Sequence, residues 1–212
     1  MDILNTLTLK SNRHIKINFD GGDLSSDAGL LLLKEFAAKI GFTKLIKRIF
    51  KTNDKSIRFH KDDENLMQMI YQIIAAYFED DCADELTLDP VFNAILEKDS
   101  LASQPTLSRF FNRMDEDTLL QFDDIDKSLR NIIYAIKRPE HMLLDLDSTL
   151  FGTYGHQEGE GFNFHYQAHG YHPLLCYDGL TGDLLKAELR DGTLHCSNNA
   201  DKFMEPLFQE YM

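Results

Sequence analysis

The spacing of apolar residues changes near Pro139, and this change constrains the fold more than any other feature of the chain. Before it, apolar residues recur at three- and four-residue steps, which places them on one face of a helix. The longest such stretch runs from about Asp115 to Lys137, with acidic residues in its first turn and Pro139 after its last. After Pro139, short apolar runs between glycine-rich stretches are typical of β-strands. We therefore predict an α/β protein with a helical module in residues 1–138 and a strand-rich module in residues 139–212.

Cap and stop signals divide the first module into several helices. Asp89-Pro90 joins an N-cap residue to a proline at the first helical position, an arrangement that begins helices. Gly41 is suited to end a helix because glycine readily adopts the left-handed conformation. The predicted elements are an extended arm over 1–20, a helix that Ser25, Ser26 or Asp27 caps and Gly41 ends, a basic helical stretch over 44–51, an amphipathic helix over 63–78, and short helices after Asp89 and Ser103.

The second module is predicted to contain three antiparallel strands and one helix. The composition of residues 178–183 is typical of a hairpin turn between two of the strands. Residues 152–161 are rich in glycine and are predicted to form a loop. The predicted elements are strands over His141–Phe151, Tyr171–Tyr177 and Leu184–Leu189, and a helix that begins at Asn198 or Asn199.

The composition excludes several classes of protein. A hydrophobic fraction of 43% can fill a core, so global disorder is not expected. No apolar run reaches the roughly 20 residues that span a bilayer, and no signal-peptide pattern is present. The widely spaced Cys82, Cys176 and Cys196 favour reduced thiols over a disulfide framework. We therefore expect a cytoplasmic protein with no membrane partner.

Basic residues gather at one end of an otherwise acidic chain. The formal net charge of −13 argues against nucleic-acid binding by the surface as a whole. Residues 1–60, however, hold 11 Lys and Arg against 6 Asp and Glu. The basic side chains of the second predicted helix and its end are Lys44, Lys47, Arg48, Lys51, Lys55 and Arg58. They could contact DNA phosphates, or they could form an ordinary solvated helix face.

Two further arginines lie four residues apart in a helical stretch. Arg109 and Arg113 could contact DNA, but Asp115 and Asp117 are close enough in sequence to pair with them. The sequence alone leaves both interpretations open.

Two carboxylates in one predicted strand are the strongest chemical signal. Asp145 and Asp147 are two residues apart, so a strand would place both side chains on the same face. Two buried carboxylates cost free energy to desolvate unless a partner such as Mg²⁺ compensates them. Alternatively, the pair lies near a strand end, where water or backbone amides solvate it.

Histidines are concentrated in the second module. With Cys176 and Cys196 they could suggest zinc, but the separations are irregular and contain no Cys-x-x-Cys or His-Glu-x-x-His. Hydrogen bonds to the backbone or to solvent are the commoner role for such residues. The five histidines are His156, His165, His169, His172 and His195.

The acidic strand resembles the first acidic strand of DDE transposases, which have an RNase H-like core. Asp147-Ser148-Thr149 fits the apolar, Asp, small, Thr pattern of that strand. More specifically, the chain resembles the 1380 group of bacterial insertion-sequence transposases. Further stretches in matching order are Leu24–Leu31, Tyr77–Asp80, Leu88–Phe92, Ala102–Phe110 with Asn112, Gly170–Leu174 and Leu189–Gly192.

The resemblance implies two-metal phosphoryl transfer with Mg²⁺ or Mn²⁺. Asp147 would be the catalytic metal ligand, and Asp145 a second metal-binding candidate. The DNA partners would be the inverted-repeat ends and the target, and the complete enzyme would be a homo-oligomer. Such enzymes also need a second Asp and a Glu, which cannot be assigned here. We therefore expect residues 139–212 to be the first portion of a truncated catalytic domain, inactive alone.

Three functions are compatible with these observations. The first is a DNA transposase that mobilises an insertion sequence. The second is a non-catalytic DNA-binding remnant or repressor of transposition. The third is an unrelated metal-dependent hydrolase that uses Asp145, Asp147 and the histidines.

Overall fold

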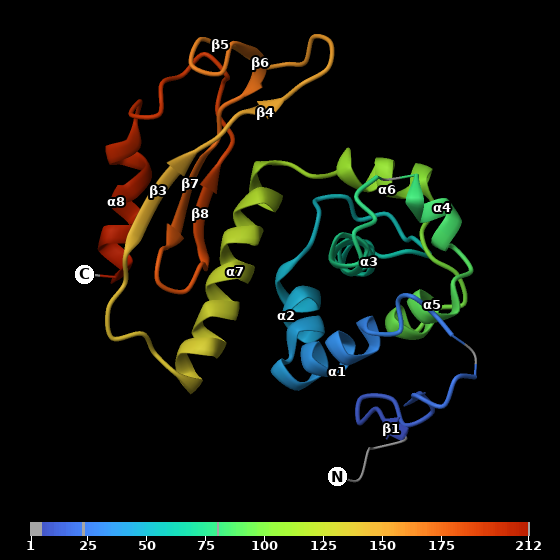
Figure 1. The fold of residues 1–212 in the computed structure, drawn as a ribbon. Helices are drawn as coiled ribbons and strands as arrows, with labels where there is room; N and C mark the ends of the chain where they lie inside the picture. The colour runs from blue at the N-terminus through green and yellow to red at the C-terminus, as the bar shows by residue number, and fades with distance from the viewer. Residues whose placement is uncertain (1–5, 23, 80, 212) are drawn as a thin grey trace. The chain divides into compact units, whose positions relative to one another are not determined.

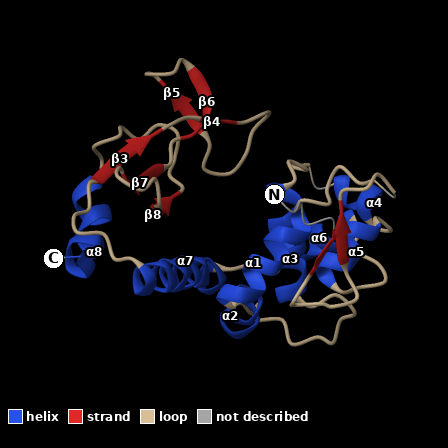
Figure 2. Ribbon diagram, turned by 60° about the horizontal axis from the view of Figure 1, so that its bottom comes forward, coloured by secondary structure: helices blue, strands red, loops and turns tan. Residues whose placement is uncertain are grey.

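The computed structural model describes residues 6–22, 24–79 and 81–211. The chain forms two compact units, Met1–Ile132 and Ile133–Met212, and the long helix α7 (Glu116–Ile136) contains the point of division. Helices dominate the first unit, whereas the described part of the second contains the end of α7, six short strands and the helix near its C-terminal end (Figures 1 and 2). The protein is therefore of mixed α/β class with small antiparallel sheets.

The first unit begins with a small hairpin and continues as helices. Strands β1 (Thr6–Thr8) and β2 (Lys16–Asn18) pair antiparallel, so the described part of the predicted arm, from residue 6 on, folds back on itself. The helices are α1 (Leu30–Ile40), α2 (Phe42–Ile49), α3 (Asp62–Ile74), α4 (Cys82–Leu86), α5 (Pro90–Leu96), α6 (Gln104–Phe111) and α7.

Local sequence explains where several of these helices begin and end. Gly41 adopts a left-handed conformation with φ of 77°, and its backbone N–H donates to the last carbonyls of α1. The Asp89 carboxylate accepts hydrogen bonds of 2.9 Å from the N–H groups of Val91 and Phe92, which caps α5 as predicted. The predicted cap of α1 was wrong, because residues 26–29 form turns and the helix begins at Leu30 with Gly29 as its N-cap.

Helix α3 ends four residues earlier than the periodicity predicted. Ala76 takes a positive φ of 66°, which turns the chain away from the helix axis. Tyr77 then packs its ring edge against Phe92 and donates its hydroxyl hydrogen bond to Asp27. Tertiary contacts therefore hold Tyr77 outside α3, although its spacing fits the apolar face of the helix.

The core of the first unit is aromatic and aliphatic. Phe50, Phe92 and Phe110 are fully buried, and the ring centroids of Phe50 and Phe110 are 5.8 Å apart. Around them pack apolar residues of several helices, among them Leu45, Ile46, Leu66, Met67, Ile95 and Ile125. This core fixes α2 with its polar face outward.

The second unit contains two three-stranded antiparallel sheets. The first has the strand order β3-β7-β8, and the second has the order β4-β6-β5. The elements are β3 (Leu144–Ser148), β4 (Phe151–Gly152), β5 (Gly161–Asn163), β6 (Ala168–Tyr171), β7 (Leu174–Asp178), β8 (Leu184–Glu188) and α8 (Ala200–Tyr211). Helix α8 packs on the first sheet, where Phe203 and Leu207 meet Leu174, Cys176 and Leu185.

The prediction of three strands and a helix describes only part of this unit. The strands predicted over His141–Phe151 and Tyr171–Tyr177 are each divided between the two sheets. Pro173 explains the second division, because it has no N–H to donate within a continuous ladder. Strand β5 contains Gly161, the last residue of the predicted loop, and β6 lies beyond it.

Among the residues that the structure describes, no helix is long and apolar enough to cross a membrane.

Candidate functional site

Asp145 and Asp147 project from the same face of strand β3. Asp145 pairs with Tyr177 and Asp147 with Leu175, whereas the alternate residues Leu174 and Cys176 are buried against α8. Directly paired residues lie on the same side of an antiparallel sheet, so both carboxylates face away from α8.

Both carboxylates are exposed, which removes one argument for a metal. On a buried strand, desolvation of two carboxylates would demand a compensating cation. Neither Asp145 nor Asp147 is buried, and the N–H of Ser148 donates a hydrogen bond of 2.8 Å to Asp147. Desolvation therefore does not require a metal here, and any metal role must rest on the position of the carboxylates.

Asp147 lies at the wall of a hollow of about 490 Å³, and Asp145 does not. We call this hollow the Asp147 pocket. Its wall combines the end of β3 with the segment between β5 and β6 and the loop before α8. The other lining residues are Ser148, Asn163, Phe164, His165, Tyr166, His172, Thr193, Leu194, His195 and Cys196.

Three glycines bring the loop before α8 against the second sheet. A Cβ atom on Gly192 would lie 2.0 Å from the carbonyl oxygen of Gly170 and 2.5 Å from that of Gly161, so no larger residue fits there without movement. The amide of Asn163 donates a 2.8 Å hydrogen bond to the Gly192 carbonyl. The stretches Gly170–Leu174 and Leu189–Gly192, separate in sequence, therefore meet beside the pocket, which His172 lines.

A buried arginine fixes the same loop. The Arg190 guanidinium donates from Nε to the carbonyl of His172 at 3.1 Å and from a terminal nitrogen to the carbonyl of Asn198 at 2.9 Å. The backbone N–H of His172 donates in return to the Arg190 carbonyl at 3.0 Å. Arg190 therefore hydrogen-bonds to both the backbone N–H and the backbone carbonyl of His172.

The histidines of the second unit divide into two sets. His165, His172 and His195 line the Asp147 pocket. His169 and His156 instead flank Glu160, with N···O separations of 2.9 and 3.5 Å, and the hydrogen bond to His169 lowers the pKa of the Glu160 carboxyl.

In the described residues, no group of three or more His, Cys, Asp or Glu side chains is placed to hold a metal ion. Cys176 is buried in the sheet, and burial raises the pKa of its thiol. The carboxylate oxygens of Asp145 and Asp147 are of the chemical kind that Mg²⁺ and Mn²⁺ accept. They therefore fit part of a divalent-metal site.

The predicted basic residues form one exposed stripe on α2. Leu45 and Ile46 are buried, whereas Lys44, Lys47 and Arg48 are exposed at the three- and four-residue spacing of one helix face. Lys51 follows the end of α2, where its backbone exchanges hydrogen bonds with the Gln121 side chain. Over the described ranges, none of these four cations has an ion-pair partner, so all four are available to an anionic ligand.

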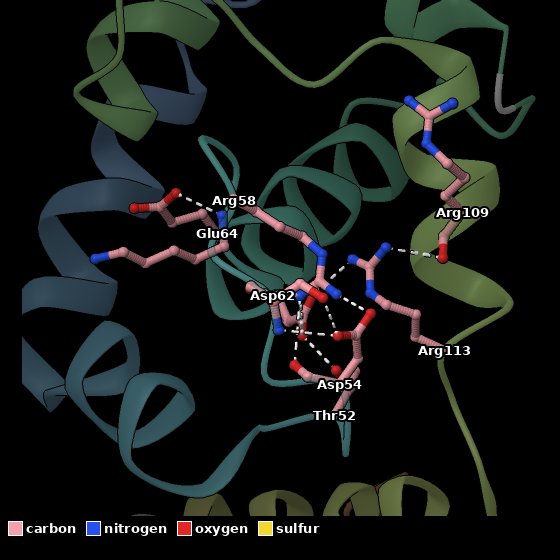
Figure 3. Close-up of polar contacts among 9 residues, drawn as sticks. Thr52, Asp54, Arg58, Asp62, Glu64, Arg109 and Arg113 are labelled. Atoms are coloured by element: carbon pink, nitrogen blue, oxygen red, sulfur yellow. Dashed lines mark hydrogen bonds and ion pairs between the residues drawn. The ribbon is translucent and has the colours of Figure 1, made fainter.

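Two other arginines are already occupied by carboxylates (Figure 3). Arg113 contacts Asp62 at 2.5 Å, rather than Asp115 or Asp117 as the sequence suggested. Arg58 pairs with Asp54 and lies 3.9 Å from Asp62, whose carboxylate also accepts from the Thr52 hydroxyl at 2.5 Å. These contacts fasten the segment after α2 to the start of α3 and to the turn that follows α6, and they remove Arg58 and Arg113 from the free basic surface.

Comparison with known proteins gives one finding. A family model described as "Transposase DDE domain group 1" matches residues 7–212, whereas no curated protein and no solved structure matches the chain.

Proposed function

Because the chain belongs to the transposase DDE domain family, group 1, we propose that it is part of a DNA transposase of the 1380 group of bacterial insertion sequences, with an RNase H-like core. The family indicates DNA as the partner and divalent metal ions as the cofactor. The order and spacing of the motifs around Asp147 and Gly170–Leu174 support the finer assignment. The family match favours this function over the unrelated hydrolase.

We propose Asp147 as the catalytic metal ligand. The observation that carries this proposal is its place on an exposed strand face at the wall of a pocket. Asp147 and Asp145 would hold Mg²⁺ or Mn²⁺. When bound, such an ion neutralises the charge that develops on phosphate oxygens and activates the attacking hydroxyl. Asp147 is the better candidate because Asp145 does not line the pocket.

We propose that the four unpaired cations on and after α2 contact the DNA backbone. Phosphate contacts position a protein on DNA without reading its sequence, which suits a stripe of flexible, exposed side chains. The same stripe favours the second candidate function, DNA binding without chemistry. The two candidates differ at the Asp147 pocket, which only the transposase needs.

We further propose that residues 1–212 do not cleave DNA unaided. DDE chemistry needs three carboxylates, and no third acidic or histidine partner joins Asp145 and Asp147 within the described ranges. The partners of the complete enzyme would be transposon ends, target DNA and further copies of the protein.

The metal site is tested by titrating Mn²⁺ into the protein by calorimetry. We expect Asp147→Asn to weaken Mn²⁺ binding by more than about tenfold, since it removes a charged ligand, and Asp145→Asn to weaken it less. Asp201→Asn is the matched control, because Asp201 is an exposed carboxylate on α8 outside the pocket. Equal Mn²⁺ affinity of the wild-type protein and the Asp147→Asn variant would contradict the proposal.

A further inference from the structure

His172 is a buried imidazole whose proton position follows from one contact. Its residue exposure is 5%, and its Nδ1 lies 2.7 Å from the carbonyl oxygen of Leu194. A carbonyl oxygen can only accept a hydrogen bond, so Nδ1 carries the proton of the neutral ring. The other nitrogen, Nε2, therefore presents a lone pair.

That lone pair has no partner in the described parts of the chain. The Nδ1 edge of the ring is turned to Leu194, and the remainder of the ring lines the Asp147 pocket beside Tyr166, whose ring centroid is 5.8 Å away. Nε2 is itself accessible, so water or a ligand in the pocket can donate a hydrogen bond to it. The arrangement suits a ligand that brings an N–H group to Nε2.

The rest of the pocket indicates what kind of ligand this is. No lysine or arginine lines the hollow in the described structure, and Asp147 is its one carboxylate. The proposed metal would offset the charge of a phosphate at Asp147, but the rest of the hollow offers a second phosphate no positive side chain. Two aromatic residues line the hollow instead, Phe164 and Tyr166, whose residue exposures are 78% and 40%. Flat rings with a neutral acceptor suit an uncharged, planar group that carries N–H donors.

We propose that the Asp147 pocket receives a nucleobase of the DNA strand, and that Nε2 of His172 accepts a hydrogen bond from an N–H group of that base. Aromatic stacking would hold the plane of the base, and His172 would select its edge. The base would belong to a nucleotide near the phosphate at Asp147. This inference rests on the proposed function, because it names the part of the DNA that the same site takes.

Two substitutions distinguish the role of Nε2 as an acceptor from the role of the hydrogen bond between Nδ1 and the Leu194 carbonyl. In His172→Asn, the side-chain amide can still donate to the Leu194 carbonyl, but no group replaces Nε2. In His172→Gln, the amide reaches the place of Nε2 and can supply an acceptor there, whereas the bond to Leu194 is lost. A purely structural role predicts that Asn is the better substitute, and the proposed role predicts Gln.

The experiment measures binding of single-stranded oligonucleotides to the full chain by fluorescence anisotropy. Each normal oligonucleotide is compared with one that carries a single abasic position, scanned along its length. We expect one abasic position to weaken binding to the wild-type protein. We expect His172→Asn to bind the normal strand about fivefold more weakly, and His172→Gln to retain more of the affinity.

Nitrogen-15 spectra of the wild-type imidazoles make the test independent of the variants. We expect His172 to show a protonated Nδ1 and a bare Nε2, and the Nε2 resonance to move with the normal strand but not with the critical abasic strand. The inference is overturned if Nε2 does not respond, if no abasic position matters, or if Asn substitutes better than Gln. Failure of the protein to bind any DNA would instead overturn the proposed function.

Discussion

Contacts of individual residues fix the loop before α8 next to the Asp147 pocket, and these contacts leave little room for larger side chains. Gly192 is packed against the backbone of two strands, and Arg190 and Asn163 hydrogen-bond to the carbonyls around it. The exposed carboxylate of Asp147 needs no such support, since it stands at the end of a strand that β7 already orders. The residues that hold the loop before α8 are therefore different from Asp147, the proposed metal ligand.

Gly192→Ala tests the tight packing of the loop before α8. We expect a loss of about 3 kcal/mol in the free energy of unfolding, because the new Cβ would meet two backbone carbonyl oxygens that cannot rotate away. Gly152→Ala is the control: nothing lies within 4 Å of its added Cβ, so the change should stay within about 0.5 kcal/mol. Urea denaturation measures both, and equal losses would contradict the packing account.

The lowered pKa of Asp54 predicts that the stability of the first unit depends on pH. Hydrogen bonds from the Ser56 side chain and backbone, assisted by Arg58, lower the pKa of its carboxyl from 3.8 to about 2. Because the folded pKa is the lower one, the stabilisation is complete above the unfolded pKa and is lost as pH falls through the folded one. Asp54→Asn should therefore lower Tm at pH 6 but have little effect near pH 2. A pH-independent difference in Tm would rule out this assignment.

At the scale of elements, α2 is the part of the described chain best suited to meet phosphates. Its apolar residues are fixed in the core, so its basic face has one orientation relative to the first unit. The segment after it is held by Asp62, Arg58 and Arg113, which stabilises that orientation without consuming the exposed cations (Figure 3).

The double variant Lys47→Gln, Arg48→Gln tests this surface. We expect weaker duplex binding and a slope of log affinity against log salt that is shallower by about 2, one unit for each lost phosphate contact. The control, Lys39→Gln with Lys202→Gln, removes the same charge from exposed positions on other helices. Identical slopes for the two double variants would show that net charge, and not α2, determines binding.

The sequence predicted those helices whose position depends on nearby residues, such as an apolar stripe, an acidic first turn or a capping side chain. The long helix α7 has a complete apolar stripe and an acidic first turn, and α5 has a cap whose side chain makes the expected bonds. Strands β5 and β6 were missed because they are short, and because close backbone approach at Gly161 and Gly170, rather than an alternating pattern, orders them.

The pocket could be predicted only in part for the same reason. The strand pattern and the family resemblance singled out Asp147 as a metal-ligand candidate, and that role stays a prediction. Its neighbours His172 and His195 come from different segments that only tertiary contacts bring together. Likewise, the partner of Arg113 is Asp62, which lies 51 positions earlier in the chain, so no local rule could find it.

At the scale of the whole molecule, charge limits how this protein can meet DNA. The net charge of −13 repels phosphates, while the surplus of basic residues is confined to the first 60 positions. The second unit, which carries Asp145 and Asp147, would approach DNA favourably only with divalent cations to offset its carboxylates. The proposed account therefore requires a metal at Asp147.

The position of that metal can be mapped directly. Fe²⁺ substituted for Mg²⁺ generates hydroxyl radicals with ascorbate and peroxide, and these cut the backbone near the bound ion. We predict fragments that end within β3 and in the pocket segments around residues 163–166 and 193–196, and their loss in Asp147→Asn but not in Asp201→Asn. Cuts confined to other parts of the chain, or cuts that persist unchanged in Asp147→Asn, would contradict the assignment of Asp147.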